Sequence, residues 1–246
     1  MTGPDVPASF RLAYVPGATP AKWVRTWAER VPDVPLTLVP VAAAVATGFV
    51  RERGADAALL RSPIDRDGLH AIPLYTETTV VVVPKDHVVA AADEVSTADL
   101  ADDVVLRPLD DTIEWDRVPG RPALERPATT ADAIELVAAG IGVLVVPQSL
   151  ARLHHRRDLT YRPVTDAPQS SVALSWLEDE TTDLMEEFIG IVRGRTVNST
   201  RGRQQPPAPA ERKRPEPQGR KTAAGKSGAG RRGGGVAKRG KPRRRS

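Results

Sequence analysis

Near the N-terminus, the hydrophobic and polar residues follow first the spacing of a strand and then that of a helix. Apolar residues alternate over residues 10–14 and the alternation stops at Pro16-Gly17, so a half-buried strand should end in a turn. A helix is expected to begin at Thr19, with the threonine hydroxyl as its cap and two tryptophans on one face. A strand at 36–39 follows after a crossover too long for a hairpin, which predicts a right-handed parallel βαβ unit.

The next segment repeats this order of helix and strand. Val45, Phe49 and Val50 predict a second helix between Val41 and Gly54, with Gly54 placed to cap its end, and residues 55–60 predict a buried strand. That strand ends at Arg61, on the same side of the sheet as Pro16-Gly17. Two further strands follow at 69–75 and 78–83. The second is apolar at every position after its threonines, so it should be a central strand that is covered on both faces.

A second set of α/β elements is predicted beyond Pro84. Its elements are a short helix at 96–101, a strand at 104–106, a helix from Thr129-Thr130 to Gly140, a strand at 142–146 and a helix at 148–154. Strands at 159–163 and 171–176 and a helix at 181–192 then return the chain. This order predicts two α/β lobes around a hinge near 80–84 and 159–163, with a ligand-binding cleft between the lobes.

The strand ends that face this cleft suggest how a small anion would be held. Residues Gly17 to Thr19 and Thr129 stand at the expected N-termini of helices, where free N–H groups and the helix dipole favour negative charge. The alternative is that both threonines only cap their helices. Arg61 is open to two interpretations as well, a guanidinium fork for a carboxylate or a solvated loop arginine.

Composition narrows the possible chemistry. The chain has 246 residues, of which 40% are hydrophobic, and it has no cysteine, which excludes disulfides and thiolate metal sites. Its four histidines are poorly spaced for a metal centre, and we expect no cofactor. The sequence has neither an apolar run long enough for a membrane span nor the apolar core of a signal peptide, which predicts a soluble, cytoplasmic protein.

The net charge of +4 conceals two segments of opposite charge. Residues 201–246 contain 16 lysines and arginines against Glu211 and Glu216, a charge of +14. Residues 1–200 contain 19 basic and 29 acidic residues, a charge of −10. Because the basic segment has almost no large apolar residue, it cannot bury a core, and residues 197–246 are predicted to be a disordered tail.

Three stretches carry a resemblance to a known family. They are FRLAYVPGA from Phe10, the segment from Gly54 that ends in strand, proline and Lys-Asp-His, and VAAGIGVLVVPQSLARL from Val137. Together, over residues 10 to about 195, they resemble the effector-binding region of LysR-type transcriptional regulators. The resemblance implies a two-lobed type 2 periplasmic-binding-protein-like α/β fold with two crossover strands, over 9–196. Lobe one would comprise 9–80 and 162–196, and lobe two 81–161.

The resemblance also implies a site and partners. Carried over by position, the residues lining an effector-binding cleft would be Pro16, Gly17, Ala18, Thr19, Ala42, Ala43, Arg61, Thr129 and Thr130. The family often has a hydroxyl at the start of its second helix, where this chain has the two alanines. Dimers, or heteromers with LysR-type regulators, are implied. The family places a winged helix-turn-helix before the strand that begins at Phe10, whereas only nine residues precede Phe10 here. We therefore expect that this chain does not recognise DNA through a helix-turn-helix.

The basic tail offers a different route to nucleic acid. Residues Lys238, Arg239, Gly240, Lys241, Pro242, Arg243, Arg244 and Arg245 resemble an AT-hook, an extended segment that lies in the narrow minor groove of A·T-rich DNA, although Lys241 replaces an arginine of its core. Lysines and arginines that neutralise phosphates also release counterions without reading any sequence. The alternative is a solubilising tail that docks on the acidic segment or on RNA.

Three classes of function follow from these observations. The first is an effector-sensing regulator that contacts DNA through its tail, and the second is a partner of full-length LysR-type regulators that does not bind DNA itself. The third, an enzyme, is disfavoured because the sequence lacks a nucleophile motif. Gly225-Lys226-Ser227 also lacks the earlier glycine of a phosphate-binding loop, since Arg220 stands there.

Overall fold

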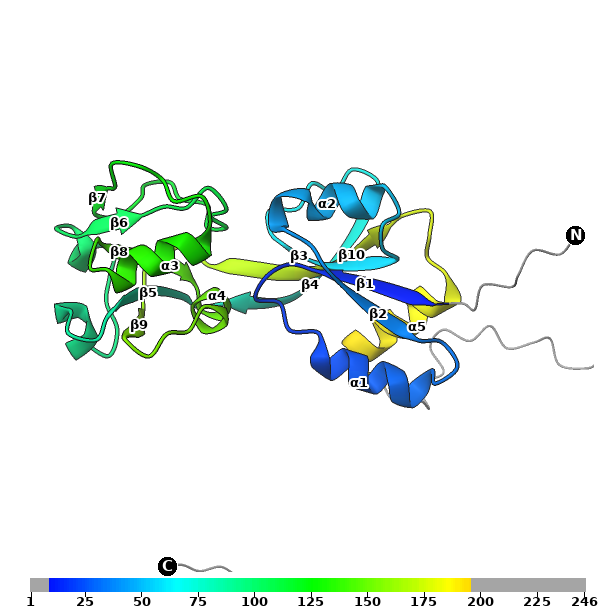
Figure 1. The fold of residues 1–246 in the computed structure, drawn as a ribbon. Coiled ribbons are helices and arrows are strands. Elements are labelled where there is room, and N and C mark those ends of the chain that lie inside the picture. The colour runs from blue at the N-terminus through cyan, green and yellow to red at the C-terminus, as the bar shows by residue number, and fades with distance from the viewer. Residues whose placement is uncertain (1–8, 196–246) are drawn as a thin grey trace, which may run out of the picture. The chain divides into compact units, whose positions relative to one another are not determined.

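The first of two sheets brings together strands from both ends of the chain. The computed structural model describes residues 9–195, which form two five-stranded sheets with helices packed on them (Figure 1). The first sheet has the strand order β2-β1-β3-β10-β4. Its strands are β1 (Phe10–Tyr14), β2 (Leu36–Pro40), β3 (Ala57–Arg61), β4 (Leu69–Glu77) and β10 (Ser170–Leu177). The predicted two-lobed α/β fold is confirmed, because the second sheet contains the other five strands.

The predicted βαβ unit at the N-terminus is present. Strand β1 pairs in parallel with β2, and α1 (Ala21–Arg30) connects them. The buried Trp27 of α1 stacks on Phe10 with ring centroids 4.8 Å apart, and its indole N–H donates to the Val34 carbonyl at 2.8 Å. Figure 1 shows α1 and α5 (Asp183–Val192) on one side of this sheet and α2 (Ala43–Arg51) on the other.

The start of α1 differs from the prediction. Pro20, not Thr19, is the N-cap residue, and no side chain caps this helix. A proline disfavours helical backbone in the residue before it, so Thr19 stays outside the helix and the turn begins at Pro20. The carbonyl of Pro20 accepts the first N–H groups, from Trp23 at 2.9 Å and Val24 at 3.0 Å.

The end of α2 also differs in detail. The left-handed backbone conformation falls on Arg53, with φ 60°, and not on Gly54. Gly54 donates its N–H back to the Phe49 carbonyl at 2.9 Å, which closes the helix end. A Cβ at Gly54 would lie 2.5 Å from the Phe49 ring, so a side chain there would force the ring to shift.

The second sheet is built around the valine-rich strand, as predicted. Its order is β7-β6-β8-β5-β9, with β5 (Thr79–Pro84), β6 (Val104–Leu106), β7 (Arg121–Pro122), β8 (Val143–Pro147) and β9 (Leu159–Pro163). On β5, Val80 and Val82 pack into one apolar cluster, with residues of α3 (Thr130–Ala138). Val81 and Val83 pack into another cluster on the opposite face. Cores on both faces explain a strand that is apolar at every position.

The crossing points between the sheets lie outside the predicted hinge segments. The chain leaves the first sheet at Glu77 and enters the second at Thr79, and it returns between Pro163 and Ser170. Segments 80–84 and 159–163 pair with each other as β5 and β9 inside the second sheet, so the crossings lie directly beside the predicted hinge segments and not within them. The expected lobe limits therefore differ from the sheet boundaries by a few residues at each crossing.

Shorter elements complete the described residues. The predicted helix at 96–101 is a single 3-10 turn, η2 (Ala98–Leu100), which follows another, η1 (Val88–Ala91). Helix α4 (Gln148–Leu153) directly follows β8, as predicted. Within residues 9–195, no helix is long and apolar enough to cross a membrane. The predicted tail, including its AT-hook-like segment, lies outside the described residues.

Candidate functional site: a cleft between the lobes

A cleft of about 840 Å³ lies where the parallel strands of the first sheet end opposite α4 of the second lobe. The first lobe contributes the β1–α1 connection (Pro16, Gly17, Ala18 and Thr19) and the β2–α2 connection (Pro40, Val41 and Ala42), together with Tyr14. The end of β4 and the crossing to β5 contribute Tyr75, Thr76, Glu77 and Thr78, and α4 contributes Gln148, Ser149, Arg152 and Leu153. Carboxyl ends of parallel strands commonly form such sites.

Five of the residues expected at the cleft by family position do line it. They are Pro16, Gly17, Ala18, Thr19 and Ala42. Ala43, the first residue of α2, and Arg61 are absent from the lining, as are Thr129 and Thr130. The sequence therefore locates the side of the cleft formed by the first lobe, and it misplaces the contribution of the second lobe.

The threonine pair at the start of α3 binds its own chain. The Thr129 hydroxyl accepts from the Asp132 N–H at 3.1 Å, and the Asp132 carboxylate accepts from the Thr129 N–H at 3.1 Å, which is a capping box. The buried Thr130 hydroxyl donates to Asp110 at 2.9 Å. Of the two interpretations of Thr129, the structure favours the cap, because protein groups occupy this helix end.

Arg61 fits neither interpretation made from the sequence. Its side chain is 4% exposed, so it is not a solvated loop arginine, and it forms an ion pair with Glu77, whose side chain is 9% exposed. The same guanidinium donates to the Ser170 hydroxyl at 3.1 Å, the Pro16 carbonyl at 3.0 Å and the Ser149 hydroxyl at 2.9 Å. Four of its five N–H donors are thus used by protein groups, which leaves no free fork for a ligand.

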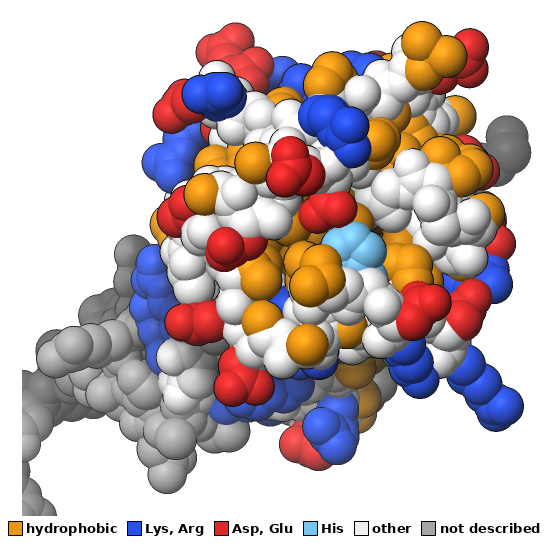
Figure 2. Space-filling view, turned by 90° about the vertical axis from the view of Figure 1, so that its left-hand side faces the viewer, with side chains coloured by type: hydrophobic (Ala, Val, Ile, Leu, Met, Phe, Trp, Pro, Cys, Tyr) orange, Lys and Arg blue, Asp and Glu red, His pale blue; other side chains and the backbone are white. Residues whose placement is uncertain are grey.

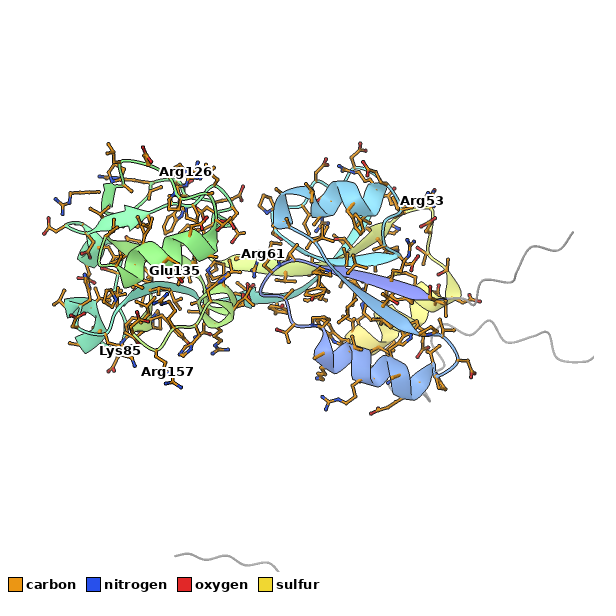
Figure 3. All side chains as sticks on the ribbon, viewed as in Figure 1. Arg53, Arg61, Lys85, Arg126, Glu135 and Arg157 are labelled. Atoms are coloured by element: carbon orange, nitrogen blue, oxygen red, sulfur yellow. The ribbon has the colours of Figure 1, made fainter. Side chains whose placement is uncertain are left out.

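The bond from Arg61 to Ser149 joins the two lobes. Arg61 ends β3 of the first sheet, and Ser149 lies on α4 of the second lobe (Figure 3 labels Arg61 at this junction). Gly17 is packed between them, since a Cβ there would lie 2.5 Å from Ser149 Oγ and 2.7 Å from Arg61 Nη2. Gly17 also has φ 83°, which residues with a side chain rarely adopt. Glycine is therefore required at this position on both grounds.

The remaining polar groups of the cleft define what it can contact. The pKa of Tyr75 is raised, first because its hydroxyl is partly buried and then because the Glu77 carboxylate is near, so the phenol stays protonated as a donor. Arg152 is an exposed cation of the lining, and its Nε donates to the Tyr161 hydroxyl at 3.3 Å. Sequence reasoning missed Tyr75, Glu77, Ser149 and Arg152. The proline-terminated strand before α4 was the one signal that pointed toward Ser149 and Arg152.

The two-lobed α/β architecture, with a cleft lined by residues of both lobes, has a periplasmic-binding-protein-like fold. Residues 9–196 match the family described as LysR substrate binding domain. The chain belongs to this family.

Known proteins similar to this chain are transcriptional regulators. It is 25% identical over 183 residues to the Hca operon transcriptional activator HcaR of Escherichia coli K12, covering 70% of this chain and 61% of the relative. It is 31% identical over 155 residues to a probable hydrogen peroxide-inducible genes activator of Mycobacterium avium, covering 58% of this chain and 50% of the relative. The chain thus spans between half and three-fifths of the length of these relatives.

Solved structures support the fold. The BenM effector binding domain with its effector benzoate superposes with a TM-score of 0.63 at 19% identity, covering 81% of this chain and 96% of that domain. At this identity, the likeness supports the fold alone. The family and its regulator relatives are consistent with a protein that is not an enzyme.

Proposed function

We propose that this chain is an effector-sensing protein of the transcription-regulator type, which binds a small molecule in the cleft between its lobes. The observation that carries the proposal is the lining of the cleft, which draws residues from both lobes beside the bond from Arg61 to Ser149. A ligand that contacts both walls would favour one relative position of the lobes over others, and such a preference is the physical basis of sensing.

The effector is proposed to be a small anionic metabolite with an apolar part. Arg152 offers an exposed cation in the cleft lining. Arg61 adds little attraction for an anion, because Glu77 neutralises it. Tyr14, Val41 and Leu153 provide apolar surface. Benzoate, the effector of BenM, is an anion of this kind.

A ligand panel tests the cleft and the charge of its ligand together. Carboxylates and neutral amides of the same carbon skeleton would be compared by thermal shift and calorimetry on the full chain. Arg152→Gln should weaken binding of the carboxylates by about tenfold or more, the effect of losing a charged hydrogen bond. Arg25→Gln, at an exposed position of α1 outside the cleft, is the matched control. Equal binding of acids and amides would refute the anionic effector and leave the cleft proposal standing.

The second part of the proposal is that the basic tail contacts DNA, without sequence preference or with a preference for A·T-rich tracts. The charge of +14 on residues 201–246 supports it, through release of counterions from DNA phosphates. Figure 2 shows the face of the second lobe that points away from the first lobe, where acidic, basic and apolar side chains are mixed. The described residues of this face include no large group of basic side chains that would suit DNA. A regulator of this kind would act in the cytoplasm.

A mobility-shift assay separates this regulator from the alternative, a partner of full-length LysR-type regulators that does not bind DNA. We expect the full chain to bind duplex DNA at low salt and the chain lacking residues 201–246 to lose this binding. Affinity should fall by about 10³ to 10⁵ between 50 and 200 mM salt if roughly six to ten phosphates are neutralised. Undetectable DNA binding by the full chain at about 50 mM salt would favour the partner function, for which light scattering with and without a full-length regulator measures the assembly. Equal binding with and without residues 201–246 would refute the proposed role of the tail.

A further inference from the structure

The second lobe contains another cavity, separated from the cleft by helix α4. It has a volume of about 220 Å³. Gln148, Ser149, Arg152 and Leu153 line the cleft, whereas Ala151 of the same helix and His154 and His155 beyond its end line this cavity. The helix therefore presents different faces to the two spaces.

The cavity combines an apolar floor with a rim of nitrogen donors. Val82, Ala151 and Leu159, all buried, form the floor. Lys85, His154, His155 and Arg156 belong to the rim, beside Thr160 and Tyr161. This volume is many times the roughly 10–15 Å³ that one water molecule requires, so the cavity has room for a ligand of several heavy atoms.

The charges of the rim are not equivalent. The Arg156 guanidinium donates through Nε and Nη2 to both oxygens of Asp158, at 3.1 Å each, and is also paired with Glu135. Lys85, by contrast, forms no ion pair within 4.0 Å with any residue of 9–195. Figure 3 shows Lys85 at the same end of the lobe as Arg157. The pKa of Asp158 is lowered first by its hydrogen bonds from Arg156 and also by the charge of Lys85, so the Asp158 carboxylate lies near Lys85, but no carboxylate among residues 9–195 pairs with Lys85 within 4.0 Å. Its ammonium is therefore the charge at this cavity that a ligand can use.

We propose that this cavity is a second binding site, for a short-chain monocarboxylate whose carbon chain lies on the floor and whose carboxylate meets Lys85. One unpaired cation matches a single negative charge, and the aliphatic floor matches an aliphatic chain. The site goes beyond the proposed function, since it lies outside the cleft and requires no movement of the lobes. The imidazole N–H groups of His154 and His155 are further donors within the lining.

Fluorine NMR on the full chain tests this site with three probes of one carbon skeleton. They are trifluorobutyrate, trifluorobutanol and trifluorobutylamine, which carry a negative, a neutral and a positive head group. We expect saturable line broadening for trifluorobutyrate, in the weak range of affinity that small fragments show, and much weaker binding of the alcohol and the amine. No saturable binding of trifluorobutyrate, or equal binding of the three probes, would overturn the proposal.

Variants locate the bound probe. Lys85→Met should weaken trifluorobutyrate binding by about tenfold, and Lys85→Arg should restore most of it. Lys22→Met, an exposed lysine of α1 in the other lobe, is the matched control and should leave binding unchanged. Leu153→Trp, which fills part of the cleft, should also leave binding unchanged. If Leu153→Trp removes the signal and Lys85→Met does not, the probe binds in the cleft and the second site is refuted, whereas the cleft proposal stands.

Discussion

The buried ion pair of Arg61 and Glu77 allows the loss of folding stability in a Glu77 variant to be predicted from the structure. Both side chains are almost fully buried, at 4% and 9% exposed, and Arg61 also bonds to three further protein groups. Glu77→Gln keeps the shape of the side chain and removes its charge, which leaves the guanidinium buried without a counter-charge. Breaking a buried pair in this way typically costs about 3–5 kcal/mol.

Urea unfolding followed by tryptophan fluorescence measures this loss. The buried Trp27 stacks on Phe10 in the core of the first lobe, so its emission should report unfolding. A loss of about 3–5 kcal/mol corresponds to a fall in Tm of roughly 6 to 20 °C for a domain of this size. The slope of the free energy against urea should stay unchanged, because the same surface is exposed on unfolding.

An exposed pair provides the control. Arg53 and Asp179 are paired at 2.9 Å with side chains 53% and 68% exposed, so Asp179→Asn should cost at most about 1 kcal/mol. Replacing the buried pair by Arg61→Met and Glu77→Leu together should cost less than the sum of the single changes. A loss for Glu77→Gln as small as that for Asp179→Asn would refute the view that this pair is buried and tightly coupled.

Three further changes have defined outcomes. Gly17→Ala should lower the free energy of unfolding by at least about 1–2 kcal/mol in denaturant titrations, because alanine is strained at positive φ and its Cβ would meet Ser149. Thr129→Ala removes a helix cap and should cost about 1 kcal/mol, whereas Thr129→Ser should be nearly neutral. The pKa of Asp166 is lowered in the folded protein, first because the Thr97 hydroxyl donates to its carboxylate. The ionised carboxylate therefore stabilises the fold above the unfolded pKa of about 3.9. This contribution is lost as the pH falls through the lower pKa of the folded state. Asp166→Asn should therefore reduce the acid sensitivity of stability, and an unchanged pH profile would contradict this assignment.

Local patterns in the sequence were sufficient for much of the fold. The all-apolar run of β5 predicted a strand covered on both faces, and the structure places a separate apolar cluster on each face. The threonine before α3 predicted a cap, which is present with Asp132 as its reciprocal partner. These features depend on residues a few positions apart, so they can be predicted from short stretches of the sequence.

The site could be predicted only in part, because its decisive contacts are not local. The partners of Arg61 lie 16, 45, 88 and 109 residues away in the sequence, so no pattern around Arg61 distinguishes a buried arginine from a solvated one. The family resemblance placed Pro16 to Thr19 correctly on the cleft. It did not reveal that Glu77 neutralises Arg61 and that Ser149 contacts it from the other lobe.

The position of β10 has a consequence for the order in which the chain can fold during synthesis. This strand is the last of the described chain, yet it lies between β3 and β4 and pairs antiparallel with both. The second sheet uses strands from Thr79 to Pro163 in one continuous segment, so it can close while the ribosome is still at work. The first sheet stays open until Leu177 has emerged. The N-terminal strands are thus made first and completed last, and their exposed edges would have to be protected in the interval.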